Sequence, residues 1–367
     1  MFKVRVIQAE FGDCFLLQYG TAAAPRHLLI DGGPPDTFAN HLEDELEAIA
    51  QAGGSLDLAM LSHVDNDHIV GLLDLTARLR ADDAADPSGD SRLIGIGGLW
   101  HNSFGRTIDP NGVLAPRLRA AGTRAAMVQA AMALNGIGEG NTLRQSAMVL
   151  GIPLNDGFAN GLICVDDHPQ PLVFDNLTLR VVGPTRANLD ELQADWEAWL
   201  DDHEDAVATG DPQVMANSDR SVPNLSSVMV LAEAHGKSVL CTGDGRSDHL
   251  LKGLAQAGLL DADGALHVDI LKVAHHGSDR NATRTFFKKV TADRYLFSAN
   301  GKDGNPDTST LIWVVEAAKA QGRSIELVVT NETPSTEKLR EEYDAQEFGY
   351  RLTIMPQGAH AMTLTLA

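Results

Sequence analysis

The chain has 367 residues, of which 50 are acidic and 29 are basic, so its formal net charge is -21 at pH 7. This excess of negative charge repels polyanions over long range, which excludes duplex binding through a broad basic face. No apolar run is long enough to span a bilayer, so we expect a cytoplasmic protein whose three cysteines, Cys14, Cys164 and Cys241, are reduced thiols in apolar surroundings.

Apolar and polar side chains alternate from Met1 to Ile7. This alternation predicts a first strand, and it is not the pattern of a secretory signal. From the length of the chain, we expect residues 1–367 to form one domain around a large core.

Four side chains that commonly bind metal follow the next strand-like run. Leu56 to Leu61 is mostly apolar, which predicts a buried strand. Past its end lie His63, Asp65, Asp67 and His68. Apolar residues then recur at helical spacing, at Ile69, Leu72, Leu73, Leu75 and Leu79. The four side chains are therefore expected at a strand-to-helix corner, where the start of the helix favours a carboxylate.

This spacing favours a metal site over an ordinary turn. A single His-x-Asp pair is usual in a solvated loop. Two imidazoles and two carboxylates crowded at a buried strand end cost free energy unless a cation offsets them. Imidazole nitrogen and carboxylate oxygen suit zinc, iron or manganese, and the share of carboxylate favours the harder cations among these.

Residues 81–220 differ from the rest of the chain in their pattern of polar and apolar residues, which predicts a largely helical insertion. A polar loop and a short strand-like segment come first, then helical spacing, then an acidic loop. The segments are Asp82 to Asp90, Leu93 to Leu99, Ala120 to Leu134, Thr142 to Leu150, Leu189 to Leu200 and Asp201 to Arg220. We expect a cap beside the metal site, with a surface for homodimer formation as the alternative.

His101 is the one residue of this insertion that suggests a role at the site. It follows a strand-like run, as the metal-ligand side chains do, so contact with substrate is one interpretation. A packed side chain beside Trp100 is the other.

Three later strand-like runs also end in polar residues. Asp244 follows Val239 to Cys241, the pair His275 and His276 follows Val268 to Val273, and Ser298 to Gly301 follows Tyr295 to Phe297. In layered α/β folds ligands gather past the carboxyl ends of strands. Asp244 is placed to bridge two cations. A plain Gly-Asp-Gly turn is the alternative interpretation of Asp244 alone.

In this order, the His-x-Asp-x-Asp-His, Thr-Gly-Asp and His-His-Gly-Ser motifs resemble the metallo-β-lactamase superfamily, and within it the ComEC-type domain of bacterial DNA-uptake proteins. Two further segments agree with the resemblance: residues 10–17 followed by 28–33 are similar to the family's opening hairpin, and residues 224–228 are similar to its Asn-x-x-Ser segment. The resemblance covers residues 1–80 and 220–330. It implies an αββα sandwich, which makes the fold class α/β.

The resemblance also implies the metal ligands. They are His63, Asp65, Asp67, His68, Asp244 and one of the two adjacent histidines. The position before glycine favours His276 as the ligand, which leaves His275 for catalysis. Asp13 and Asp31, in the hairpin, are expected to fix loops by hydrogen bonding.

Two positions depart from the family pattern. Asn224 stands, with no histidine beside it, where most members supply a further histidine to the first metal. Asn305-Pro306 stands where ComEC-type domains have His-Pro. We therefore expect two divalent ions, zinc or manganese, of which one is weakly held or absent.

The leading hypothesis is a metal-dependent phosphodiesterase or nuclease that uses a hydroxide bound to the metal. Asp67 and His275 are the candidate catalytic residues. The candidate substrate contacts are His101, Asn224, Ser278, Asn300 and Lys302. The alternatives are a hydrolase of small esters, lactones or amides, and a non-catalytic protein that binds metal and docks a partner.

The distribution of basic residues bears on which substrate the site could bind. Basic residues gather in sequence around the His-His-Gly-Ser motif, at Lys272, Arg280, Arg284, Lys288, Lys289, Arg294 and Lys302. They are expected to form either a local basic rim for a phosphodiester or nucleic-acid substrate, or an ordinary solvated helix face. No membrane partner is expected.

Overall fold

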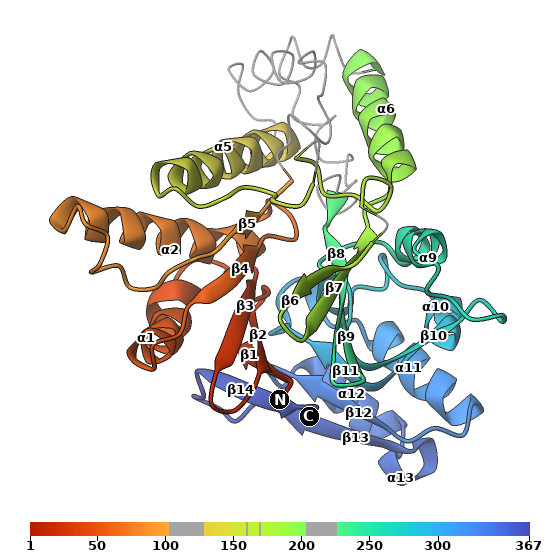
Figure 1. Cartoon of the computed structure of the whole chain (residues 1–367). Helices are drawn as coiled ribbons and strands as arrows, with labels where there is room; N and C mark the ends of the chain where they lie inside the picture. Colours follow the sequence, from red (N-terminus) through yellow and green to blue (C-terminus); the bar gives the residue numbers. More distant parts are fainter. Residues whose placement is uncertain (103–127, 159–160, 169, 203–225) are drawn as a thin grey trace.

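The computed structural model describes residues 1–102, 128–158, 161–168, 170–202 and 226–367 (Figure 1). Two β-sheets pack face to face, with helices on both outer sides. This is an αββα sandwich, so the predicted α/β fold class is confirmed. The two termini lie close together, because the first and last strands, β1 and β14, pair in the same sheet.

The first sheet has six strands in the order β14-β1-β2-β3-β4-β5. The strands are β1 (Lys3–Ile7), β2 (Phe15–Gly20), β3 (Pro25–Ile30), β4 (Leu56–Met60), β5 (Leu99–Trp100) and β14 (Ala361–Thr365). In β1 the side chains of Val4 and Val6 are buried while Lys3 and Arg5 are partly exposed, as the alternation predicted.

The second sheet has eight strands in the order β13-β12-β11-β10-β9-β8-β7-β6. The strands are β6 (Leu172–Phe174), β7 (Leu177–Gly183), β8 (Met229–Ala234), β9 (Lys237–Cys241), β10 (Leu266–Lys272), β11 (Val290–Phe297), β12 (Ile325–Val329) and β13 (Tyr350–Ile354). Strands β9 to β13 are parallel, so their carboxyl ends share one edge.

Three apolar layers hold the sandwich together. The layer between the sheets contains Val6 of β1, Ile30 of β3 and Ile270 of β10. The outer face of the first sheet packs on η1 (Phe38–Leu42), α1 (Glu43–Gln51), α2 (Asn66–Ala85) and α5 (Val128–Val149). The outer face of the second sheet packs on α9 (Ser247–Gln256), α10 (Arg284–Lys289), α11 (Thr308–Ala320), α12 (Pro334–Glu342) and α13 (Ala345–Phe348). All three cysteines are buried free thiols, as expected.

The described part of residues 81–220 contributes to both sheets. β5 extends the first sheet, and β6 and β7 form the edge of the second. The two predicted helices around 120–150 are one helix, α5, in the described residues, and the helix predicted from Leu189 is α6 (Arg186–Asp202). Of the strand-like run predicted over Leu93 to Leu99, only Leu99 lies in a strand, β5. Within the described residues, α5 and α6 are the helices that could form the predicted cap. Most of the predicted acidic loop lies outside the described residues.

In the described part of the chain, no helix combines the length and the apolar character that a membrane span needs.

Helix α2 begins at Asn66 and so carries Asp67 and His68 in its first turn, as predicted. Its backbone lies directly on the loop after β3. Gly32 N–H donates to His68 O at 2.7 Å, and a Cβ added at Gly71 would lie 1.9 Å from Gly32 O. Only a residue without a Cβ fits there, so Gly71 sets how closely the two segments approach.

Substitution of Gly71 by alanine should therefore destabilise the fold. The methyl group has to push α2 away from the loop, and we expect a loss of about 1–3 kcal/mol in the free energy of unfolding, as for other overpacked sites. Gly138→Ala in α5 is the matched control, because nothing lies within 4 Å of its added Cβ. Urea denaturation of the two variants measures the difference, and equal stabilities would contradict the close packing.

Candidate metal centre

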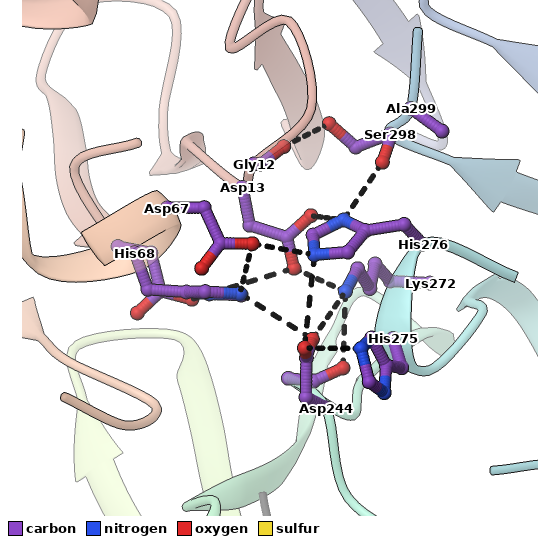
Figure 2. A network of polar contacts seen from close by, with 12 residues as sticks. Gly12, Asp13, Asp67, His68, Asp244, Lys272, His275, His276, Ser298 and Ala299 are labelled. Carbon is purple, nitrogen blue, oxygen red and sulfur yellow. Dashed lines mark hydrogen bonds and ion pairs between the residues drawn. The ribbon is translucent and has the colours of Figure 1, made fainter. Parts of the chain in front are cut away.

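The site lies where strands of both sheets end (Figure 2). His63 follows β4 of the first sheet, Asp244 follows β9, and the pair His275 and His276 follows β10 of the second. Asp67 and His68 enter from the start of α2. The structure thus brings together the side chains that the sequence placed past strand ends.

Asp244 is at the centre, with its side chain 3% exposed. Four imidazoles face its carboxylate through their Nε2 atoms. The distances to the nearer oxygen are 3.7 Å for His63, 3.3 Å for His68, 3.7 Å for His275 and 3.6 Å for His276. These separations exceed an ordinary hydrogen bond. Two ligand atoms that share a tetrahedral cation, with bonds of about 2.0–2.1 Å, lie roughly 3.4 Å apart. The four distances are close to this separation.

The other ring nitrogen of each histidine has its own hydrogen-bond partner. The partners of Nδ1 are Ser62 Oγ for His63 at 3.0 Å, Asp31 Oδ2 for His68 at 2.9 Å, Asn281 Oδ1 for His275 at 2.8 Å and Ser298 O for His276 at 2.9 Å. The carboxylate and the carbonyl can only accept. Ser62 Oγ already donates to Asp31 Oδ2, so it accepts from His63. Each neutral imidazole therefore carries its proton on Nδ1 and turns the Nε2 lone pair toward Asp244.

The donor set fits a divalent cation. His63 Nε2, His68 Nε2 and Asp244 Oδ1 are buried, and none of the three has a hydrogen-bond partner among the described residues. Buried polar atoms without partners are costly, and lone pairs that face a carboxylate need positive charge between them. Ligand atoms of Asp67, His68, Asp244 and His276 lie within 4.8 Å of one another, as do those of His63, Asp65 and Asp67.

The electrostatics of the site also favour positive charge. Burial opposes ionisation of Asp244, but the imidazoles of His276, His68, His275 and His63 hold its pKa well below its usual range. Burial likewise opposes charging of His68, and the carboxylates of Asp244, Asp67 and Asp31 raise its pKa well above the usual value. His276 Nε2 lies 3.0 Å from Asp67 Oδ2, a contact that needs a proton or a cation between the atoms.

Asp31 orients the first half of the site. Its carboxylate accepts hydrogen bonds from Ser62 N–H at 2.6 Å, from Ser62 Oγ at 2.7 Å and from His68 Nδ1. The sequence predicted such a loop-fixing role for Asp31. The structure adds that Asp31 sets the tautomer of His68, which points its Nε2 at Asp244.

Lys272 and Asp13 form a buried ion pair beneath the ligands. The side chain of Lys272 is 2% exposed, donates to Gly243 O at 3.0 Å and lies 3.8 Å from Asp244 Oδ1. Asp13 was expected to hydrogen-bond its loops. Its carboxylate instead pairs with Lys272 and lies 3.6 Å from His276 Nδ1.

The basic residues near the His-His-Gly-Ser motif do not all lie beside the site. Lys272 is buried, and Arg294 pairs with Glu326. Lys288 and Lys289 directly precede β11, whereas the metal centre lies past its other end. β11 has eight residues, so about 23 Å separates its ends. Sequence proximity could not reveal this, because a strand carries the chain across the whole sheet.

Three of the predicted substrate contacts, Asn300, Lys302 and Ser278, have partners within the protein. Asn300 donates to Glu10 Oε2 at 3.0 Å, Lys302 Nζ lies 3.4 Å from the centroid of the Phe11 ring, and Ser278 Oγ, which is buried, accepts from Arg280 N–H at 3.4 Å. His101 is packed under α5, where a Cβ at Gly140 would lie 3.0 Å from its Nε2. Burial lowers the pKa of His101 to about 4, so the ring is neutral at pH 7. Asn224 lies outside the described residues.

Sequence reasoning missed Asn281 and Ser298 as supports of the adjacent histidines. Asn281 is buried and bonds both His275 and Asp244 O, the latter at 2.8 Å. Its place five residues after His276 was the only signal available. Ser298 acts through its backbone carbonyl, which no side-chain pattern reveals.

The chain matches one family model and is similar to solved structures. The sequence model of the metallo-beta-lactamase superfamily matches residues 8–119, which include the His63 to His68 motif. This match supports a metal-binding fold of that superfamily. Among solved structures the chain is similar to zinc-bound PqqB from Methylobacterium extorquens, with 13% identity, 100% of each chain covered and a TM-score of 0.39. No curated protein matches the chain.

Removal of the Asp31 carboxylate should weaken metal binding. In Asp31→Asn the amide nitrogen would face His68 Nδ1–H, so His68 has to place its proton on Nε2, the atom that faces Asp244. Loss of such an outer partner typically lowers metal affinity by about 10–100-fold. Zinc titration against a competing chelator measures the change.

Asp269→Asn is the matched control, because this carboxylate accepts from Ser238 N–H and Ser238 Oγ in the same manner and its partners, Lys237 and Ser238, are not ligand residues. Equal zinc affinity in Asp31→Asn and the control would contradict the role of Asp31.

Proposed function

We propose that the protein is a metal-dependent phosphodiesterase of the ComEC type that acts on a short or single-stranded phosphodiester. The observation that carries the proposal is the ring of imidazole and carboxylate ligands around Asp244 at the meeting edge of the two sheets. Three carboxylates, Asp65, Asp67 and Asp244, belong to this set, and oxygen-rich sites favour the harder cations that phosphoryl chemistry commonly uses.

The charge balance supports two divalent cations. Lys272 offsets Asp13, which leaves the carboxylates of Asp31, Asp65, Asp67 and Asp244 around the same space. Their formal charge matches that of two dications. When bound, such cations lower the pKa of water from about 15.7 toward 7 and stabilise charge on a phosphoryl oxygen.

The protein's own residues then orient the reactants. Asp67 is 23% exposed, so one oxygen can face both His276 and an incoming water. His68 and His276 are nearly fully buried and held through Nδ1, so they keep the ligand side of the site rigid. His63 is likewise buried, while Asp65 and His275 are 30% and 25% exposed and therefore mark the side open to substrate.

The surface charge limits the size of the substrate. With a net charge of -21, long duplexes would be repelled. A short or single-stranded diester presents fewer phosphates. The same acidic surface favours a second candidate, hydrolysis of a small carboxylic ester, lactone or amide by the same ligands.

Turnover assays decide between these functions. Protein loaded with manganese, and separately with zinc, is offered bis-p-nitrophenyl phosphate, a single-stranded oligonucleotide, plasmid and p-nitrophenyl acetate. We expect diester hydrolysis to exceed ester hydrolysis, with little cleavage of the duplex. Asp67→Asn should lower kcat by about 10²–10⁴-fold, as loss of a positioned acid or base does. Asp293→Asn, an exposed carboxylate of β11, is the control.

Ester hydrolysis that exceeds diester hydrolysis would favour the second candidate. If no substrate is turned over and Asp67→Asn behaves like the wild type, the hydrolase proposal is wrong.

A further inference from the structure

Lys272 places a fixed positive charge directly beside the metal ligands. It is the last residue of β10, and its side chain is 2% exposed. Its ammonium group pairs with Asp13 Oδ2, donates to Gly243 O at 3.0 Å and lies 3.8 Å from Asp244 Oδ1 (Figure 2). One buried ammonium therefore faces two carboxylates and forms a close ion pair with only one of them, Asp13.

The ammonium of Lys272 is a potential competitor for Asp244. Asp244 Oδ1 is buried and has no hydrogen-bond partner in the part of the chain that the structure describes. Its distance from Lys272 Nζ exceeds that of a charged hydrogen bond by about 1 Å. Because the stem of a lysine is flexible, a small movement would close this gap. The new contact would occupy an oxygen that a cation needs, and the charge of Lys272 would also repel that cation.

The loop that carries Asp13 is fixed in place. Asp13 N–H donates to Asp67 O at 3.1 Å, and a Cβ added at Gly12 would lie 2.0 Å from the same oxygen. On its other side, Gly12 O accepts from Ser298 Oγ at 2.5 Å. The carboxylate of Asp13 is 1% exposed. Asp13 therefore has little freedom to move, and its ion pair restrains the ammonium of Lys272.

The imidazoles of the site do not account for Asp13. Its oxygens lie 3.6 Å from His276 Nδ1 and 3.8 Å from His68 Nδ1, which is too far for a hydrogen bond. Each of these nitrogens has a nearer partner at 2.9 Å. The charged group that Asp13 contacts most closely is therefore Lys272.

We propose that Asp13 is a positioning residue that acts through Lys272: it restrains the ammonium and so leaves Asp244 Oδ1 available to a cation. The inference rests on the proposed function as a metal-dependent hydrolase. It predicts opposite effects for the two partners, because loss of Asp13 releases a competitor and loss of Lys272 removes it. An ion pair that only supported the fold would weaken metal binding whichever partner was lost.

Zinc affinity tests this assignment without reference to activity. The full chain is stripped with chelator, and zinc is titrated against a competing chelator for the wild type, Asp13→Asn, Lys272→Met and the double variant. Each substitution removes a charge and keeps a side chain of similar size. The matched control is Lys237→Met/Asp269→Asn, which removes a 2.7 Å ion pair between β9 and β10 whose partners are not ligand residues. Far-UV circular dichroism confirms that each variant is folded.

We expect Asp13→Asn to lower zinc affinity by about 10–100-fold, as loss of an outer partner of a metal site does. Lys272→Met should bind zinc at least as tightly as the wild type. The double variant should recover most of the affinity that Asp13→Asn loses, and the control should leave zinc affinity unchanged. Should Asp13→Asn fail to fold, the comparison of Lys272→Met with the wild type still decides the matter.

Two results would overturn the assignment and leave the hydrolase proposal standing. One is weaker zinc binding by Lys272→Met than by the wild type. The other is a double variant that binds zinc no better than Asp13→Asn. A wild type that binds no divalent ion contradicts the proposed function itself.

Discussion

The structure depends on the compensation of one buried carboxylate. Asp244 is almost inaccessible to solvent, and four imidazole nitrogens lie 3.3–3.7 Å from its oxygens. A buried charge is stable only when it is paired or coordinates a metal. Because each imidazole is tied through Nδ1 to a different part of the fold, the lone pairs cannot turn away, and the arrangement requires positive charge at its centre.

The two sheets of the sandwich bring these ligand side chains together at one edge. β4 and the start of α2 bring His63, Asp67 and His68 from the first sheet, while β9 and β10 bring Asp244 and the adjacent histidines from the second. Close backbone contact at Gly32 and Gly71 holds α2 near Asp31. At the other side, a Cβ at Gly277 would lie 2.7 Å from Pro306 and 2.8 Å from Phe297, so the turn that carries both histidines is also packed tightly.

Much of this could be predicted from the sequence, because the signals were local. Apolar runs that end in ligand-type residues located β4, β9, β10 and β11, and helical spacing located α2. The sequence could not decide between a basic rim and a solvated helix face, because a one-dimensional cluster of charge says nothing about which end of a strand each residue occupies. Asn281 and Ser298 were missed because amide orientation and carbonyl direction depend on tertiary contacts.

Crystallography of metal-loaded protein, with anomalous scattering recorded at the zinc or manganese edge, tests the central claim most directly. The account predicts anomalous peaks on both sides of Asp244, each within ligand distance of imidazole Nε2 atoms, with the Nδ1 atoms still bonded to Asp31, Ser62, Asn281 and Ser298. A metal-soaked structure with no peak beside Asp244, or with the imidazoles bound through Nδ1, would contradict it.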